Sequence, residues 1–452
     1  MSQLTSLAKT PGEAASKEPI DVVLRPFRRF SQQEAAGGVA LFLATLAAFL
    51  WANSPFAESY FAYWQGYLEI GAGRFSTSHS IHHWINDGLM AIFFLVMGME
   101  IKRELLVGEL KNPRAAMLPI LAALGGVMVP AVIFLAVTWG SGATRGWAIP
   151  TATDIAFSLG ALALLGSRAP VGLKVFLAAL AIVDDIVAVL VIAIFYSGDL
   201  SAGALISAAI WYAGAWALNV LGVRSPLPYA LVGTGLWVSV FASGIHATIA
   251  GVLLAFAIPA RSKIDALSYA AEVRALIDHF AAHVDPQEKF VHRSEALEAL
   301  HLVERRTEAV QAPLLRFEHG LHSWVSFVIM PLFALANAGV RVVGDRPDLT
   351  EAAIGTALGL AAGKPLGVTL FSWIAVQSGV AALPDNVSWR HIHGAGWLAG
   401  IGFTMALFVG ELAFKEGPTL AAVKLAILGA SALAGTVGAI VILRTPRTGQ
   451  AA

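Results

Sequence analysis

The chain has 452 residues, of which 57% are hydrophobic and only 13% charged, with 30 basic and 30 acidic side chains. Soluble domains carry about 25% charged residues, and several apolar runs here reach the ~20 residues needed to cross a bilayer. The composition therefore excludes an ordinary soluble protein, predicts an all-α polytopic membrane protein, and its balanced charge gives no reason to expect a nucleic-acid partner.

Apolar runs separated by polar loops predict about twelve transmembrane helices. We expect a cytoplasmic N-terminal tail at 1–33, eight spans within 34–260 and a charged cytoplasmic helical insertion at 261–316. Four more spans occupy 317–445, and a short C-terminal tail occupies 446–452. The segment 55–80 is aromatic and interrupted by polar residues, so it is predicted to form an external hairpin-like segment. The spans lie near 37–51, 83–101, 116–138, 148–165, 173–195, 202–221, 226–241, 245–258, 321–339, 350–377, 394–412 and 419–443.

The distribution of basic residues predicts the orientation of the chain. Cytoplasmic loops of membrane proteins are enriched in Lys and Arg. One set of loops here collects most of these residues, and the other set holds only a few. The basic set comprises Arg25, Arg28, Arg29, Lys102, Arg103, Lys111, Arg114, Arg168, Lys174, Arg224, the 261–316 block, Arg390, Arg444 and Arg447. Both termini and the insertion are therefore predicted to be cytoplasmic.

Two adjacent aspartates, Asp184 and Asp185, interrupt the apolar run AALAIVDDIVAVLVI. A charge at bilayer depth costs about 3 kcal/mol on insertion scales, and two neighbouring carboxylates also repel each other. A chain that keeps both groups at its most apolar point is expected to use them. The pair predicts a cation or proton site inside the membrane.

Asp154 in the fourth span and Lys364 in the tenth are further intramembrane charges. Each alone is compatible with a structural ion pair, but one lysine cannot neutralise three carboxylates. Carboxylates together with hydroxyl and carbonyl oxygens suit a dehydrated Na⁺ or Li⁺ ion. Protons compete for the same carboxylates, and this competition is enough to couple two gradients.

The surroundings of these charges predict two discontinuous helices. Pro150 lies four residues before Asp154, and proline removes a backbone donor. Gly400 and Gly402 interrupt the eleventh span in LAGIGFT. Unwound backbone is tolerated at membrane depth only where it is buried in protein or lines a cavity. By contrast, the glycine ladder of the tenth span has the four-residue spacing of close helix packing; it comprises Gly355, Gly359, Gly363 and Gly367.

Several motifs occur together in a characteristic order. They are NDGLMAIFFLVMGMEIKREL at 86–105, IPTATDIAFSLGALALLGSR, FLAALAIVDDI, SGIHATIAG, PLFALANAG at 331–339, GKPLG and GIGFT. Over roughly residues 30–443 the chain closely resembles the NhaA-type sodium/proton antiporters of bacterial inner membranes. The resemblance implies inverted repeats, with the fourth and eleventh spans crossing near the midplane. It also implies transport of Na⁺ or Li⁺ against H⁺ without a cofactor, and a possible homodimer through the external hairpin-like segment.

Matched position by position, the resemblance also implies roles for single residues. Asp185 would be the principal ligand of the transported Na⁺ and Asp184 its companion carboxylate. Lys364 would pair with Asp184 in one state, and Thr153 would lie beside Asp154 at the crossing. Asp87 would lie near the external end of the pathway. The residues that match the family's pH-response positions are Glu100, Arg103, Glu104, Glu318 and His319 at the cytoplasmic end, and His246 on the external side.

These pH-response positions also have plainer interpretations. Glu100, Arg103 and Glu104 have i, i+3 and i+4 spacing, which is equally typical of a salt-bridged surface turn. His319 could be an ordinary interfacial residue, and His246 could cap a helix. The long insertion, with helical patterns at 272–285 and 294–310, could be a plain hairpin or could alter the pH response.

Three functional interpretations differ in how much of the sequence they explain. An electrogenic secondary antiporter, pH-regulated and serving sodium and pH homeostasis, explains the adjacent aspartates. A sodium-coupled symporter of a small organic solute is the alternative, although no intramembrane arginine is available to bind a solute's anionic group. An enzyme is not expected, because HExxH and GxSxG are absent and GLAAGKPLG lacks the P-loop spacing. The Na⁺, Li⁺ or K⁺ preference, and whether Lys364 or Asp184 carries the second proton, remain open on the sequence.

Overall fold

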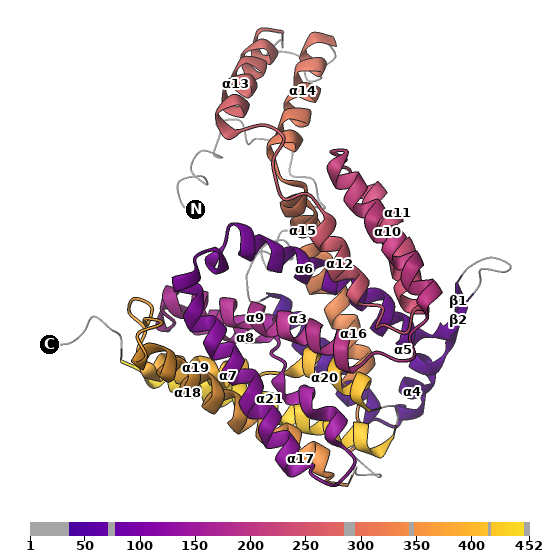
Figure 1. Cartoon of the computed structure of the whole chain (residues 1–452), viewed down its shortest axis with the longest axis vertical. Coiled ribbons are helices and arrows are strands. Elements are labelled where there is room, and N and C mark those ends of the chain that lie inside the picture. Colours follow the sequence, from indigo (N-terminus) through magenta and orange to yellow (C-terminus); the bar gives the residue numbers. More distant parts are fainter. Residues whose placement is uncertain (1–35, 71–76, 284–293, 343–347, 415–416, 447–452) are drawn as a thin grey trace.

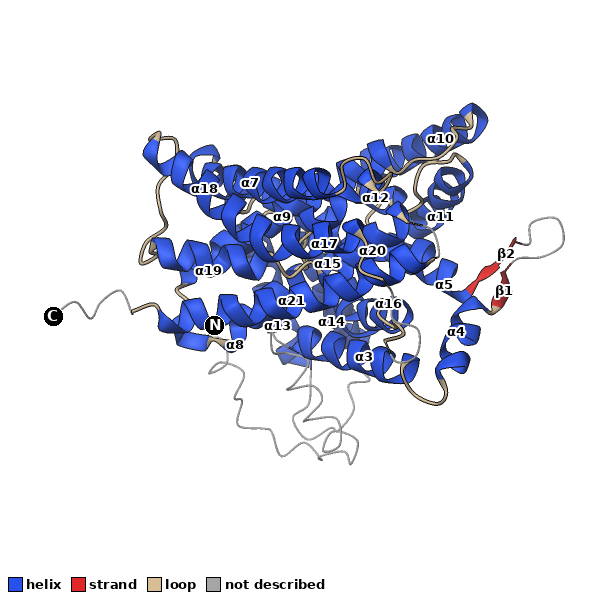
Figure 2. Ribbon diagram, turned by 90° about the horizontal axis from the view of Figure 1, so that it is seen from below, coloured by secondary structure: helices blue, strands red, loops and turns tan. Residues whose placement is uncertain are grey.

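The computed structural model describes residues 36–70, 77–283, 294–342, 348–414 and 417–446. The predicted N-terminal tail at 1–33 and most of the C-terminal tail lie outside the described residues. The described chain is almost entirely helical, with one small two-stranded sheet at the edge of the molecule (Figure 2). Eight helices are long and apolar enough to cross a membrane, or up to ten if each of two bent helix pairs forms one span. The chain is therefore a multi-pass membrane protein.

The first part of the chain forms an edge of the helix bundle and the two-stranded β1–β2 sheet. Helix α3 is bent by 113° from α4, and β1 pairs antiparallel with β2, with Tyr67 opposite Ser80. A helix with a π-helical turn follows directly. The bounds are α3 (Ala36–Ala52), α4 (Ala57–Gln65), β1 (Tyr67–Ile70), β2 (Thr77–Ser80), α5 (Ile81–His83), η2 (Trp84–Leu89), α6 (Met90–Leu106) and η3 (Glu109–Lys111).

The central helices pack around α7 and α9. Helix α7 begins after Asn112, whose side chain caps it, and has Pro113 at its first position, where a missing N–H costs nothing. The middle elements are α7 (Pro113–Val137), η4 (Thr144–Thr151), α8 (Ile155–Leu164), η5 (Gly166–Arg168), α9 (Val171–Phe195), α10 (Ala202–Val220), α11 (Pro226–Ala242) and α12 (Ile249–Ala257).

The charged insertion forms two helices that project from the bundle as a hairpin, α13 (Ala266–His283) and α14 (Ser294–Val310) (Figure 1). The predicted helical pattern at 294–310 coincides with α14, and the pattern at 272–285 falls in α13 apart from its last two residues, which are not described. Arg306 pairs with Glu272 at 2.9 Å across the hairpin. The insertion therefore packs mainly on itself.

The last part of the chain returns to the bundle. Its elements are α15 (Pro313–Trp324), η6 (Val325–Ile329), α16 (Met330–Asn337), α17 (Glu351–Leu358), η7 (Gly359–Gly363), α18 (Lys364–Gln377), α19 (Trp389–Ala399), α20 (Phe403–Ala413) and α21 (Pro418–Arg444). The glycine ladder lies against α7: a Cβ on Gly363 would come within 2.8 Å of Pro130, and one on Gly367 would collide with the Gly125 carbonyl. Close packing of the tenth predicted span is confirmed.

Two helical paths are interrupted at the centre of the bundle. The path through η4 and α8 breaks between Thr151 and Ile155, and the path through α19 and α20 breaks between Ala399 and Phe403 with a bend of 45°. A Cβ on Gly400 would approach the Leu360 carbonyl to 2.5 Å, so glycine also allows close packing at this second break. The two breaks meet, and the candidate site is built around them.

Candidate ion site at the crossing of two interrupted helices

Asp154 joins the two breaks. Its Oδ1 accepts a hydrogen bond from the Phe157 N–H at 3.0 Å and so caps α8. Its Oδ2 accepts from the Thr404 N–H at 3.1 Å and from the Thr404 hydroxyl, at the start of α20. Helix N-termini present unpaired N–H groups and a partial positive charge. One buried carboxylate therefore serves the N-termini of two half-length helices at once.

Hydroxyl groups satisfy the carbonyl end of α19. The Ser158 hydroxyl donates to the Leu398 carbonyl at 2.9 Å, and Thr153 Oγ1 lies 2.9 Å from the Ala399 carbonyl. The Asp154 N–H donates to the Ile401 carbonyl at 2.7 Å. Because these groups replace the missing intrahelical bonds, the unwound backbone keeps its hydrogen bonds away from water.

Lys364 forms an ion pair with Asp184 at this crossing. Its Nζ lies 2.5 Å from Asp184 Oδ2 and 2.9 Å from Thr153 Oγ1, and neither charged side chain is exposed. Thr153 Oγ1 is also 2.6 Å from Asp184 Oδ2; since a hydroxyl has one hydrogen, it donates either there or to the Ala399 carbonyl. Lys364 directly follows the π-helical turn η7. Such turns are frequent at functional sites.

Asp185 lies next to this ion pair and is 2% exposed. The charges that act on it electrostatically are Asp184, Glu100, Asp154 and Lys364. Asp184 Oδ1 is buried and has no hydrogen-bond partner among the described residues. The crossing thus combines three aspartates with one lysine, and it retains carboxylate oxygen that the ion pair does not use. These hard oxygen donors suit a monovalent cation or a proton.

The pH-response residues expected from the resemblance fall at two ends of the molecule. Arg103 lies 3.3 Å from Glu104, 3.1 Å from Glu318 and 3.6 Å from Glu100, so four of the six residues form one group, named here the Arg103 cluster. His319 follows Glu318 and is exposed. The cluster is therefore more than a surface turn of one helix, because Glu318 comes from α15.

His246 lies at the opposite end of α6, with Asp87. His246 Nε2 is 3.2 Å from Asp87 Oδ1, and His83 Nδ1 is 3.0 Å from Asp87 Oδ2. His246 Nδ1 is also 2.8 Å from the Thr248 hydroxyl. Asp87 and Arg103 are sixteen positions apart on one helical path, which is about 24 Å at 1.5 Å per residue. The residues expected to respond to pH therefore lie at two separate sites, which agrees with the expected placement of His246 away from the others.

Several residues at these sites were not predicted from the sequence to have a role. Thr404 binds Asp154 at the start of α20. Ser158 and His83 were not singled out. A hydroxyl residue following the glycines of a broken span is a usable signal for Thr404. No nearby sequence pattern predicts a role for Ser158, because the Leu398 carbonyl to which it donates is 240 positions away.

Comparisons of the sequence with known proteins identify the family. The family model described as Na⁺/H⁺ antiporter 1 matches residues 28–442. A Na⁺/H⁺ antiporter NhaA of Koribacter versatilis is 48% identical over 96% of this chain and 95% of its own length. Proteins of the same name from Oleidesulfovibrio alaskensis and Wolinella succinogenes are 49% and 44% identical over 93% and 90% of this chain, and over 94% and 91% of their own lengths. These names leave the symporter alternative without support, and the chain belongs to the Na⁺/H⁺ antiporter 1 family.

Proposed function

We propose that the protein is an electrogenic secondary antiporter that exchanges cytoplasmic Na⁺ or Li⁺ for external H⁺ by alternating access. The observation that carries this proposal is the buried group of Asp184, Asp185, Thr153 and Lys364 at the crossing of two interrupted helices. The same oxygens attract a cation and a proton, so the two occupants exclude each other. Exclusive binding at a site that faces each side in turn is sufficient for exchange.

Within this proposal Asp185 is the principal ligand of the transported Na⁺. It is buried beside Asp184, whose Oδ2 is already held by Lys364 and Thr153. Arrival of a cation competes with Lys364 for Asp184. The ion pair in this structure therefore represents a state in which Lys364 holds the place of a cation, and Asp154 and Thr404 hold the crossing in shape.

Electrogenic exchange follows if two protons leave for each monovalent cation that enters. Asp185 supplies one of these protons. Either Asp184 or Lys364 supplies the second proton, since Lys364 Nζ contacts Asp184 Oδ2 and the charge of each group affects the other. Two protons moving against one Na⁺ carry net positive charge, so membrane potential would help to drive Na⁺ out of the cell, in support of sodium and pH homeostasis.

The architecture proposed for this cycle has about twelve spans related by inverted repeats. The fourth and eleventh spans are the discontinuous helices, through η4–α8 and α19–α20. We place the protein in the bacterial inner membrane, with both termini, the Arg103 cluster and the insertion on the cytoplasmic side, because basic loop residues collect there. The hairpin β1–β2 is then external and offers a homodimer contact, with membrane lipid around the bundle.

The pH response is proposed to use the Arg103 cluster on the cytoplasmic side. Arg103 contacts carboxylates from both α6 and α15, so a change in their charge alters the attraction between two helices. Glu100 in this cluster also acts on Asp185 electrostatically. His246 and Asp87 form a second titratable pair at the external end of the pathway.

Everted membrane vesicles test the proposal directly. In energised vesicles, added Na⁺ or Li⁺ should release lumenal protons, with a rate that rises over an alkaline pH series and falls when the membrane potential is dissipated. Comparing Na⁺, Li⁺ and K⁺ ranks the cations. If none of the three cations moved protons at any pH, exchange by this protein would be ruled out.

A further inference from the structure

Helix α20 carries three side chains on one stripe, at positions 404, 408 and 411, which have i, i+4 and i+7 spacing. Thr404 binds Asp154 at the crossing. The Phe408 ring lies 5.3 Å from the His246 ring. Glu411 is in the last turn of the helix and forms an ion pair with Lys424 of α21. One 11-residue helix thus links the ion site to the end of the molecule that carries β1–β2, named here the hairpin face.

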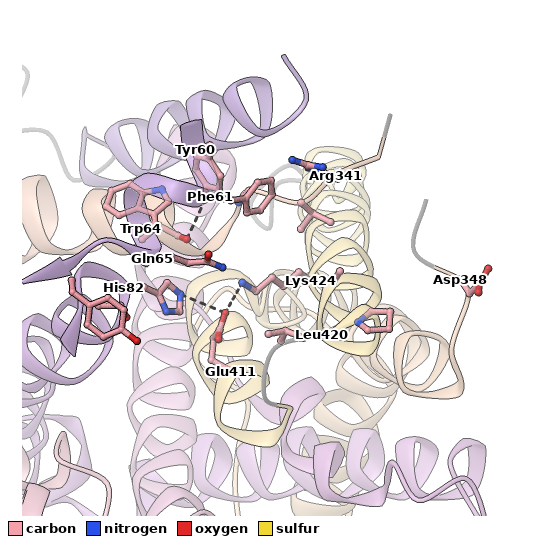
Figure 3. Close-up of a pocket in the computed structure, with 18 residues that line it drawn as sticks. Tyr60, Phe61, Trp64, Gln65, His82, Arg341, Asp348, Glu411, Leu420 and Lys424 are labelled. Carbon is pink, nitrogen blue, oxygen red and sulfur yellow. Dashed lines mark hydrogen bonds and ion pairs between the residues drawn. The ribbon is translucent and has the colours of Figure 1, made fainter. Parts of the chain in front are cut away.

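Glu411 has two basic neighbours from different elements (Figure 3). Lys424 contacts its Oε1 directly, and His82 Nε2 of α5 lies 3.7 Å from the same atom. Both Glu411 and Lys424 are largely buried, with side chains 13% and 12% exposed. Two elements that are far apart in the sequence therefore approach the same carboxylate.

The protonation of His82 is constrained by Asn337 of α16. The Asn337 amide nitrogen donates to the Phe333 carbonyl at 3.0 Å, so its oxygen is the atom that lies 2.9 Å from His82 Nε2. An amide oxygen only accepts hydrogen bonds, so this contact favours a hydrogen on Nε2, although the Asn86 amide nitrogen also lies 3.5 Å from that atom. A positive charge on the ring would lie beside Glu411.

These groups border a cavity of about 990 Å³. The other titratable or charged groups that line it are Tyr60, Tyr67, Arg341 and Asp348. His79, His83 and Asp87 lie close to His82 in the sequence, on β2, α5 and η2. The cavity wall thus contains both acids and bases, and Lys424 is the charge in direct contact with Glu411.

We propose that Glu411 is a positioning residue for the exchange, whose ion pair with Lys424 holds α20 against α21 and whose attraction to α5 increases when His82 is protonated from the hairpin face. This proposal rests on the antiport function proposed above. The transported ions do not bind Glu411 in this scheme. Its effect reaches the ion site through Thr404 and Asp154, at the other end of the same helix.

The experiment uses radioactive Na⁺ efflux from right-side-out vesicles, with the lumen at fixed pH and the medium varied from about pH 6 to about 8.5, where histidine titrates. Glu411→Gln should lower the maximal rate about threefold, as expected for loss of one partly buried ion pair, and should flatten the dependence on medium pH. The Na⁺ concentration at half-maximal rate should stay unchanged. His82→Gln should flatten the same pH dependence while keeping the maximal rate.

Two further variants keep the test decisive. The exchanged pair Glu411→Lys with Lys424→Glu should recover the maximal rate lost in Glu411→Gln, which a folding defect would not allow. Glu58→Gln, which changes an exposed acid on α4 near the same face, should behave as wild type. The inference is overturned if wild-type vesicles exchange Na⁺ but Glu411→Gln retains both the rate and the pH profile. If wild-type vesicles show no exchange, the proposed function itself fails.

Discussion

The ion site and the Arg103 cluster contain the same kinds of group in very different surroundings. Lys364 and Asp184 are both 0% exposed, whereas Arg103 is 33% exposed and lies among three glutamates that are 14–34% exposed. Removing two charges from water costs several kcal/mol per ion, and only a close partner offsets that cost. Ion pairs in contact with solvent contribute about 0–1 kcal/mol to stability. We therefore expect the stability of the ion site to depend on which cation or proton occupies it. The Arg103 cluster is expected only to adjust the pH response.

The largest effect is expected from the aspartate pair. Asp185→Asn and Asp184→Asn should each abolish Na⁺-dependent proton release in everted vesicles, because an amide carries no exchangeable charge. Asp199→Asn is the matched control, since Asp199 is an exposed residue in the loop after α9. Full activity in either site variant would remove the proposed mechanism.

Stability should separate the two regions sharply. Asp184→Asn leaves the Lys364 ammonium buried without its partner and should lower the free energy of unfolding by about 3–5 kcal/mol. Arg103→Gln should cost about 1 kcal/mol or less. Thermal unfolding in detergent measures both changes, and adding Lys364→Met to Asp184→Asn should recover much of the loss. If Asp184→Asn and Arg103→Gln lowered the free energy of unfolding equally, the contrast between a buried and a solvent-exposed charge cluster would be contradicted.

The crossing should tolerate a serine at position 404 but not an apolar residue. Thr404→Val removes the hydroxyl donor to Asp154, a hydrogen bond to a charged group worth about 1.5–3 kcal/mol. We expect a lower melting temperature and slower exchange, and Thr404→Ser should restore both. If serine were no better than valine, shape rather than the hydroxyl would control this position.

The Arg103 cluster should change the pH response more than the maximal rate. Glu318→Gln removes the charge that α15 contributes to Arg103 and should displace the pH profile of proton release, while the fastest rate stays within about twofold, as expected for a pair in contact with solvent. Glu298→Gln on α14 is the control. If the variant lost maximal rate while its pH profile stayed unchanged, Glu318 would act in the transport step and not in the pH response.

The smallest effect is expected in the insertion, away from both charge clusters. Hydrogen bonds from the Ser268 N–H and hydroxyl lower the pKa of Asp265, which precedes α13. A lowered pKa means that this stabilisation is present above the ordinary pKa of about 4 and is lost as pH falls through the lowered value. Asp265→Ala should speed amide exchange in α13 at neutral pH, with transport unchanged. At pH values below the lowered pKa the variant and wild type should exchange alike.

The two regions also differ in how far the sequence predicted them. The charges of the ion site stood out because aspartate and lysine are rare in apolar runs, and the glycine ladder predicted close packing correctly. The multi-pass helical architecture followed from composition and periodicity. The roles of Asp184, Asp185 and Lys364 came from the family resemblance, and they stay predictions.

Contacts between residues far apart in the sequence could not be predicted from the sequence. Thr153 and Lys364 are 211 positions apart, and Asn86 and Asn337 are 251 apart. No pattern in the sequence predicted the π-helical turns at η2, η6 and η7. The pairing of His246 with Asp87 likewise required the fold.

Sodium titration of the purified protein tests the central claim most directly. Calorimetry in buffers of different ionisation enthalpy measures Na⁺ binding and proton release together. We predict that wild-type protein binds Na⁺ with release of protons, that binding weakens about tenfold for each pH unit of acidification per proton released, and that Asp185→Asn binds no Na⁺. Binding by Asp185→Asn with wild-type affinity, or binding without proton release, would contradict a shared site for Na⁺ and H⁺.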